Sequence, residues 1–309
     1  MLRTILAVGL LATCPVGKAA VAFHSAHVMV VDETSGEVLL KKDVDAAAPI
    51  ASLTKLMTAM VVLDAQQDPD EDLRIDIADT DDFKHSRGGV PVGAVVSRGF
   101  LLELALLASD NRAASALARS YPGGLRAFDA AMRRKIHALG LNSTSIAEPT
   151  GLSPSNMSSA RDMVLVLRAA AGYPVIAQIT SHRSKIVLVS SRTRIVRNTN
   201  RLVGGSEWQV LLSKTGFTNE AGRCLGMWAR TDGRTVTVVL IGAARPSLLA
   251  RDATTIRRWL AAGRPAVLAH SAGLRPPAVV ESSRTTAIGL DPQRTDDSTT
   301  GKAEDARAR

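Results

Sequence analysis

The sequence predicts an α+β fold, with a sheet built from both ends of the chain and a helical subdomain formed by its middle. Two observations lead to this prediction. Short β-branched and apolar runs, bounded by turn residues, occur near the start of the chain and again after residue 209. Between them, apolar residues recur at helical spacing. With 309 residues, 46% of them hydrophobic, the chain can form one sizeable core or two packed subdomains.

The strands are predicted from runs of four to eight residues between turn signals. Residues 27–31 and 38–40 flank Thr34-Ser35-Gly36, which indicates a hairpin. Three further strands are expected near the other end of the chain, over residues 210–214, 224–230 and 235–241.

The helices are predicted from apolar residues at helical spacing. Residues 51–65 have the length and pattern of a helix, and Pro49 stands just ahead of its start. The same pattern predicts helices over residues 100–108, 113–119, 123–139, 160–171 and 248–260.

An aspartate-rich segment, residues 68–82, has acidic residues at positions that resemble a calcium-binding loop. Leu73 stands where such a loop needs glycine for its sharp turn, so a solvated acidic loop is expected instead. The histidines are dispersed and no zinc-ligand spacing is present. We therefore expect no metal and no cofactor.

The two ends of the chain differ in composition from residues 23–262, which are expected to form the folded domain. Residues 1–22 have a basic start, a short apolar stretch and a small-x-small site, which predicts an export signal and a periplasmic protein. Residues 263–309 are rich in Pro, Ser, Thr, Arg and Asp, which predicts a polar, largely disordered tail. The residues around Cys14 faintly resemble a lipoprotein site, but Thr13 is large for the position before the cysteine.

Charge and aromatic content limit the possible partners. The net charge is +9, and its arginines are scattered, which fits either a solvated surface or attraction to an anionic polymer. Only 3% of residues are aromatic and no basic stripe contains aromatics, so nucleic acid is not expected as a partner. Cys14 and Cys224 are the only cysteines, and removal of the signal would leave Cys224 without an internal partner.

Three short motifs carry the functional prediction: Ser52-Leu53-Thr54-Lys55, Ser109-Asp110-Asn111 and Lys214-Thr215-Gly216. Each is weak alone, and each is the only match of its kind in the chain. In this order and at these wide spacings they are the signature of active-site serine enzymes that act on D-Ala-D-Ala peptides and β-lactams.

Ser52 and Lys55 stand three residues apart near a predicted helix start, which places both side chains on one face. A serine hydroxyl is a poor nucleophile and needs a base. Lysine is a base only when it is neutral, so its pKa must be lowered. Burial and a neighbouring positive charge both lower the pKa of a lysine, and Lys214 is the candidate neighbour.

The other motif residues fit substrate handling. Ser109 can relay a proton to the leaving amine, and Asn111 can hydrogen-bond a substrate carbonyl. The residues that surround the end of the strand at 210–214 fit a binding role: Lys214 and Thr215 can hold a carboxylate, Gly216 lets substrate approach the backbone, and the N–H of Phe217 can form an oxyanion hole with that of Ser52. Asp110 is expected to point away. Taken singly, each motif also fits a helix cap or a strand-end turn.

The chain closely resembles the low-molecular-weight penicillin-binding proteins, which are D-alanyl-D-alanine carboxypeptidases and endopeptidases. The resemblance spans roughly residues 26–262, and several stretches beyond the motifs carry it. These are residues 49–59, 108–114, 121–124 and 148–153, together with residues 197–200 and 213–222, which are similar to the endopeptidase branch of the penicillin-binding protein 7 type.

The resemblance implies a β-lactamase/D,D-peptidase-like fold, with an antiparallel sheet flanked by helices plus an all-helical subdomain. It also implies Ser52 as nucleophile, Lys55 as base, and cleavage of peptidoglycan stem peptides, with endopeptidase action on cross-links favoured. β-Lactam antibiotics would be covalent inhibitors. Asp110 departs from many relatives of this branch. No second β domain or amphipathic C-terminal anchor is recognisable, so at most peripheral membrane contact is expected.

Two alternatives stay open. A class A-like β-lactamase needs a loop carboxylate to activate the deacylating water, and Glu148 opens such a loop, but Leu152 stands where that class has asparagine. A non-catalytic peptidoglycan-binding protein with an inherited fold is the other. The rate at which bound penicillin is released separates these two alternatives from the D,D-peptidase. A β-lactamase releases it fast, a D,D-peptidase releases it slowly, and a non-catalytic protein forms no adduct.

Overall fold

A computed structural model of the chain describes residues 21–81, 89–189 and 192–263. The predicted export signal, residues 1–22 with Cys14, and the predicted polar tail, residues 263–309, lie almost entirely outside the described residues. Both therefore stay predictions.

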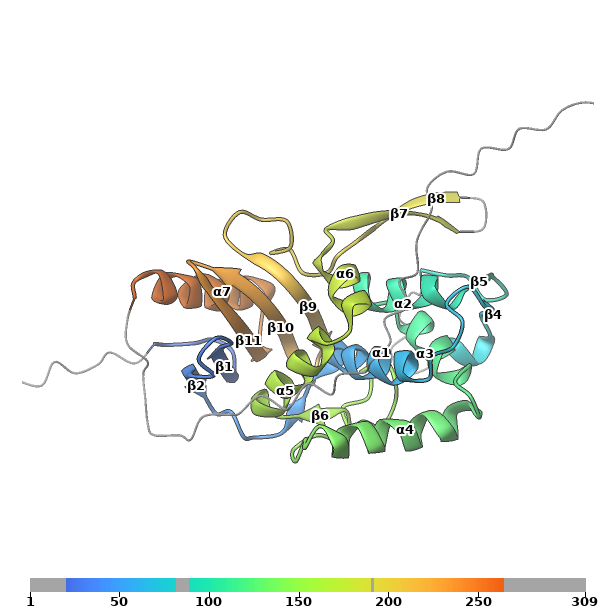
Figure 1. The fold of residues 1–309 in the computed structure, drawn as a ribbon, viewed down its shortest axis with the longest axis horizontal. Helices are drawn as coiled ribbons and strands as arrows, with labels where there is room; N and C mark the ends of the chain where they lie inside the picture. The colour runs from blue at the N-terminus through green and yellow to red at the C-terminus, as the bar shows by residue number, and fades with distance from the viewer. Residues whose placement is uncertain (1–20, 82–88, 190–191, 264–309) are drawn as a thin grey trace, which may run out of the picture. The chain divides into compact units, whose positions relative to one another are not determined.

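The sheet has five antiparallel strands in the order β2-β1-β11-β10-β9 (Figure 1). Two strands come from the start of the chain and three from its end, as the sequence predicts. Val30 of the first strand lies opposite Leu40 on one side and Val238 on the other. The strands are β1 (His27–Asp32), β2 (Val38–Lys42), β9 (Gln209–Thr218), β10 (Gly222–Thr231) and β11 (Arg234–Ala243).

The helices fall where apolar residues recur at helical spacing, with one exception. The pattern does not predict helix α6 (Pro174–Ser181). It has eight residues, of which only Ile176 and Thr180 are buried, so it is too short to show a helical period. The helix at Ser52 begins with a tight 3-10 turn, η1 (Ala51–Leu53), before the α-helix proper. The α-helices are α1 (Thr54–Asp64), α2 (Arg98–Leu107), α3 (Asn111–Arg119), α4 (Gly124–Ala138), α5 (Ala160–Ala171), α6 (Pro174–Ser181) and α7 (Pro246–Ala261).

Helices cover both faces of the sheet (Figure 1). Successive side chains of a strand point to opposite faces, so β1 contributes to two apolar cores. Val28 packs in the core that contains Trp259 of α7. Met29 packs in the larger core that contains Leu167 of α5. This alternation is what joins α7 and α5 to the same sheet.

The helical subdomain is built around α1, which is buried over nearly its whole length and contacts α2, α3, α4 and α5. The fold is therefore α+β, with an antiparallel sheet flanked by helices and a helical region beside it, as predicted. In the part of the chain that the structure describes, no single helix is long and apolar enough to cross a membrane. The pair α5 and α6, bent by 103°, passes that test when the two are joined.

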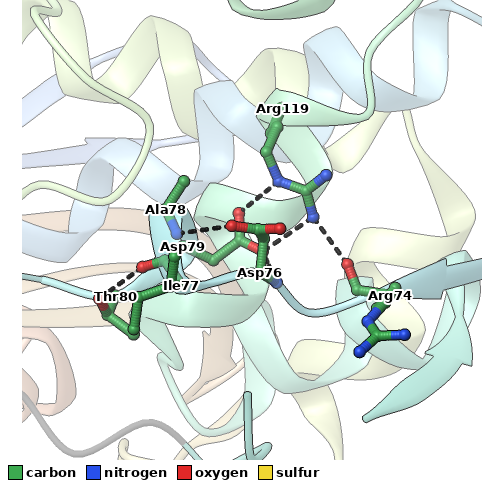
Figure 2. A network of polar contacts seen from close by, with 7 residues as sticks. All are labelled: Arg74, Asp76, Ile77, Ala78, Asp79, Thr80 and Arg119. Atoms are coloured by element: carbon green, nitrogen blue, oxygen red, sulfur yellow. Dashed lines mark hydrogen bonds and ion pairs between the residues drawn. The ribbon is translucent and has the colours of Figure 1, made fainter. Parts of the chain in front are cut away.

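The aspartate-rich segment is more ordered than predicted. Residues 72–74 form strand β4 (Asp72–Arg74), which pairs with β5 (Val95–Ser97). Asp79 is buried, and both of its carboxylate oxygens accept hydrogen bonds of 2.8 Å from the guanidinium of Arg119 (Figure 2). The expectation of a solvated acidic loop is therefore wrong for part of this segment. Leu73 is buried, and the buried carboxylate of Asp79 is neutralised by Arg119.

Two further features differ from the sequence prediction. Strands β7 (Ser184–Val189) and β8 (Arg192–Arg197) form a separate hairpin that the sequence analysis does not predict, although residues 186–189 are a short continuous apolar run of the kind found in buried strands. The segment Lys214-Thr215-Gly216 lies inside β9, which continues to Thr218, and not at a strand end. The motif is therefore held by ladder hydrogen bonds to β10 on one side.

Candidate active site

Ser52 and Lys55 lie at the junction of η1 and α1, where their side chains meet. Lys55 Nζ lies 3.0 Å from Ser52 Oγ. A three-residue spacing places two side chains on the same side of a helical turn, and this holds for the 3-10 turn formed here. Lys55 is 1% exposed, so its amine reaches Ser52 from inside the protein.

Three oxygens surround the Lys55 amine. Besides Ser52 Oγ, Nζ donates to Asn111 Oδ1 and to the backbone carbonyl of Thr150, both at 2.6 Å. An ammonium group has three donors, so these contacts satisfy it fully. The amide and carbonyl oxygens can only accept. When Lys55 is neutral, its lone pair can therefore take a proton from only one of these three groups, the Ser52 hydroxyl.

The electrostatics of the site favour a neutral Lys55 near physiological pH. Burial lowers the pKa of Lys55 from 10.5 to about 7, against the opposing effect of the carboxylates of Glu148 and Asp110. Lys214 is fully buried, and its pKa is lowered well below 10.5 by burial first and then by the charge of Lys55. The sequence predicts that burial and a neighbouring Lys214 both lower the pKa of Lys55. In the structure burial is the largest cause of the lowered pKa at both lysines, and two positive charges side by side disfavour each other.

The turn from α2 to α3 holds the second motif. Ser109 has a left-handed backbone with φ of +60°. Asp110 caps α3, because its Oδ1 accepts from Ala113 N at 2.9 Å, and its Oδ2 accepts from Gly89 N. This cap makes Asn111 the first residue of α3 and directs its amide to Lys55. The structure thus brings Asn111 into the cluster and turns Asp110 away, whereas Ser109 forms none of the three Lys55 contacts.

The third motif lies on β9, beside η1. A Cβ atom on Gly216 would lie 3.0 Å from Ser52 N and from Ile50 O, so a side chain there would press on the turn that carries Ser52. The sequence assigns this glycine to substrate approach, and the structure adds the turn as a nearer neighbour. Lys214 Nζ donates to the Thr215 carbonyl at 3.0 Å. Phe217 follows at the rim, where the Arg223 guanidinium stacks 3.6 Å from its ring centre.

Sequence reasoning missed the structural role of Glu148. Its carboxylate accepts from Thr150 N at 2.7 Å, Thr150 Oγ1 at 2.6 Å and Gly151 N at 2.6 Å. It also accepts from Ser153 N at 3.2 Å and Asn156 Nδ2 at 3.1 Å. One carboxylate therefore organises the loop and fixes the Thr150 carbonyl that contacts Lys55. The run Glu148-Pro149-Thr150-Gly151 is a weak sequence signal for such a turn.

The same loop contacts the backbone of the turn that carries Ser52. Gly151 has φ of +87°, and a Cβ there would lie 2.0 Å from Ala51 O. Ala51 itself has φ of +48°, a left-handed conformation that is rare outside glycine. Asn156 is fully buried, and its Nδ2 donates to Thr54 Oγ1 at 3.1 Å. Two glycines, Gly151 and Gly216, therefore allow two segments to close on the Ser52 backbone.

Comparison with known proteins supports the relationship that these motifs indicate. Residues 15–245 match the Peptidase_S11 family, described as D-alanyl-D-alanine carboxypeptidase. The chain belongs to this family. Among S11 relatives, it is 44% identical over 242 residues to a D-alanyl-D-alanine endopeptidase of Pseudomonas aeruginosa, covering 78% of each chain. It is 42% identical over 242 residues to the protein of the same description in Escherichia coli, again covering 78% of each.

Solved structures agree with this S11 assignment. A penicillin-binding protein homologue from Mycobacterium tuberculosis superposes with a TM-score of 0.73 at 29% identity, over 84% of this chain and all of that one. The D,D-transpeptidase of Streptomyces K15 gives a TM-score of 0.72 at 25% identity, over 78% of this chain and 98% of that one. The predicted family and fold are confirmed. Within the three described ranges, no group of three or more His, Cys, Asp or Glu side chains is placed to hold a metal ion.

Proposed function

We propose that this protein is a serine D,D-peptidase that hydrolyses D-Ala peptide bonds of peptidoglycan through an acyl-enzyme on Ser52, and that it favours cross-links over pentapeptide ends. The observation that carries the proposal is the 3.0 Å contact between Ser52 Oγ and the buried amine of Lys55. The endopeptidase preference is supported by the printed names of the relatives at 44% and 42% identity.

In the first step, neutral Lys55 accepts the Ser52 hydroxyl proton while Oγ attacks the D-Ala carbonyl carbon. An Oγ–C bond forms, and the carbonyl oxygen gains negative charge. The backbone N–H groups of Ser52 and Phe217 stabilise this oxyanion. The C–N bond then breaks, and Ser109 relays the proton from Lys55 to the leaving amine. Ser52 is left as an ester of the substrate.

In the second step, water attacks the ester carbonyl. Lys55, again neutral, accepts a proton from the water, and the C–O bond to Ser52 breaks. The proton on Lys55 returns to the Ser52 oxygen, so the free enzyme is restored. β-Lactams would enter by the same first step and remain as a slowly hydrolysed ester on Ser52.

The binding residues act on the parts of the substrate that do not react. Asn111 hydrogen-bonds a substrate peptide group from the first turn of α3. Lys214 and Thr215 hold a substrate carboxylate, with Gly216 keeping the strand open to close approach. A buried lysine with a depressed pKa is stabilised in its charged form when an anion arrives. A substrate carboxylate beside Lys214 would therefore favour the protonated lysine and bind to it as an ion pair.

Glu148 argues against the β-lactamase alternative. A deacylating base must hold a water, yet this carboxylate already accepts from the backbone amides of Thr150, Gly151 and Ser153, and from two side chains. A carboxylate offers about four acceptor sites, so none is left for a catalytic water. The non-catalytic alternative does not explain why a lysine that is costly to bury lies 3.0 Å from the Ser52 hydroxyl.

The deciding experiment is digestion of purified cross-linked dimeric muropeptides and uncross-linked pentapeptide monomers, followed by chromatography and mass spectrometry. We expect two monomers to appear for each dimer that is lost, with little free D-Ala from pentapeptide. Ser52→Ala should cut neither. Release of D-Ala while dimers persist would make the protein a carboxypeptidase, and cleavage of neither by the wild type would contradict the proposal.

We also propose that residues 1–22 export the protein to the periplasm, where it makes at most peripheral contact with the membrane. Fractionation of cells that produce the full chain tests this. The protein should appear in the periplasmic fraction with its N-terminus near residue 23. Retention in membranes after a high-salt wash would contradict it and point to Cys14.

A further inference from the structure

The β7–β8 hairpin is firmly anchored on one of its faces. Val187 and Val196 pack against the larger core. Lys185 forms an ion pair with Glu103 of α2, and Arg194 Nη1 donates to the Gly89 carbonyl at 3.1 Å. Because these inward contacts fix the hairpin, the side chains on its outer face are held in place relative to the core.

The outer face of the hairpin exposes a pair of isoleucines. Ile186 and Ile195 lie directly opposite each other across the two strands. They are 69% and 57% exposed, among the largest exposures of any big hydrophobic side chain in the described residues. Directly opposed apolar side chains on a sheet form one continuous patch. An apolar pair that is exposed on a rigid support is a feature of contact surfaces.

The charge around this pair is of one sign. Between residues 182 and 206 the sequence contains no Asp and no Glu, and its cations are Arg183, Lys185, Arg192, Arg194, Arg197 and Arg201. Arg197 is exposed and lies two residues after Ile195 in β8, so its side chain is on the same face as the isoleucines. The outer face therefore combines small apolar area with positive charge, which suits an anionic ligand that carries small apolar groups.

The base of the hairpin lies at the edge of the candidate active site. Thr199, two residues beyond β8, accepts a hydrogen bond at 2.7 Å from the hydroxyl of Thr215 on the site strand. Its backbone N–H donates to the Leu107 carbonyl at 3.3 Å, just ahead of the Ser109 turn. Asn198 Nδ2 closes the base by donating to the carbonyls of Thr180 at 2.8 Å and His182 at 3.0 Å.

We propose that the outer hairpin surface, formed by Ile186, Ile195 and Arg197, binds neighbouring stem peptides of polymeric peptidoglycan while one cross-link occupies the site. This inference rests on the proposed function. Stem peptides carry free carboxylates and alanine methyl groups, which match Arg197 and the isoleucines. Residues 182–206 contain no aromatic side chain to stack on sugar rings, so the peptides and not the glycan are the ligand.

An anionic membrane has a similar chemistry, but the continuity of the hairpin with Thr199 and Thr215 favours the substrate polymer. Sacculi and lipid vesicles are therefore compared directly. Two variants change the surface, Ile186→Ser with Ile195→Ser and Arg197→Gln. Matched controls change exposed residues elsewhere: Ile77→Ser with Val95→Ser, which are 69% and 55% exposed, and Arg126→Gln on α4.

Four measurements are made on each variant: co-sedimentation with intact sacculi, co-sedimentation with phosphatidylglycerol vesicles, the rate of cross-link cleavage in sacculi, and the rate on a soluble dimeric muropeptide. We expect both surface variants to lose at least fivefold in sacculus binding and cleavage, and to stay within twofold of wild type on the soluble dimer. The controls should match wild type throughout. Unchanged melting temperatures would show that each variant is folded.

Equal binding of sacculi by the surface variants and wild type would overturn the proposal. So would loss of binding to phosphatidylglycerol vesicles with no loss of binding to sacculi, which would make the surface a membrane contact. A wild type that sediments with sacculi through this surface but cleaves neither substrate would support the surface and contradict the proposed function. The two failures are therefore distinguishable.

Discussion

The backbone carbonyl of Thr150 lies 2.6 Å from Nζ of Lys55, although the two residues are 95 positions apart. The contact connects the base of the site to a loop that Glu148 organises through hydrogen bonds to Thr150 and Gly151. The position of the Lys55 amine therefore depends on a carboxylate that does not touch it. The same loop, through Gly151, contacts the backbone of the turn that carries Ser52.

Acylation by penicillin should depend on pH through Lys55. Burial lowers the pKa of this lysine to about 7, so the amine is neutral above that pH and protonated below it. Only the neutral form accepts the Ser52 proton, so the rate should fall about tenfold for each pH unit below 7. Stopped-flow acylation between pH 5 and 9 measures this. A flat profile, or a rise only near pH 10, would show that Lys55 does not act as the base.

Glu148→Gln should shift that profile toward lower pH. The carboxylate raises the pKa of Lys55, so removing its charge makes the amine neutral over a wider range. An amide oxygen cannot replace both acceptor oxygens, so the melting temperature should fall as well. Glu37→Gln, at an exposed site far from Lys55 in sequence, is the control and should change neither quantity. A shift toward higher pH would contradict the assigned effect.

Gly151→Ala should slow acylation much more than an equivalent change elsewhere. Its Cβ would lie 2.0 Å from Ala51 O, so the turn that carries Ser52 must move. Gly233→Ala is the matched control, because Gly233 also has positive φ, +74°, but a Cβ there meets nothing within 4 Å. Both changes should cost about 1 kcal/mol of backbone strain, and only the first should lower the acylation rate. Equal acylation rates in the two variants would show that the close contact of Gly151 with the Ser52 turn does not matter for acylation.

Lys214→Ala should lower kcat/KM for a substrate that carries a free carboxylate. A buried charge-assisted contact of this kind is worth about 2–4 kcal/mol, which is roughly 30- to 1,000-fold. Ser213→Ala, a change to the preceding buried residue on β9, should leave kcat/KM near wild type. A loss of less than about tenfold in Lys214→Ala would show that another group holds the carboxylate.

Local patterns were enough for most of the fold. The helical period locates α5 at its observed bounds, because a buried face repeats within each turn. Strand runs at both ends predict the sheet, whose pairing of β1 with β11 crosses the whole domain. The β7–β8 hairpin is not predicted, because arginines interrupt its apolar residues. Tertiary contacts bury Val187 and partly bury Val196.

The site could be predicted only in part. The spacing of Ser52 and Lys55 is local, so a helical turn predicts their contact. The contacts of Thr150 with Lys55 and of Gly151 with Ala51 join segments about a hundred positions apart, so local patterns in the sequence do not predict them. The lowered pKa of each lysine, Lys55 and Lys214, likewise depends on burial that only tertiary packing produces.

Intact-mass spectrometry of the protein mixed with benzylpenicillin, followed by peptide mapping, tests directly whether Ser52 is the nucleophile. We expect that wild type gains the full mass of one penicillin, that the adduct maps to the peptide containing Ser52, and that Ser52→Ala gains no mass. An adduct on Ser52→Ala, or on any residue other than Ser52 in the wild type, would contradict this assignment.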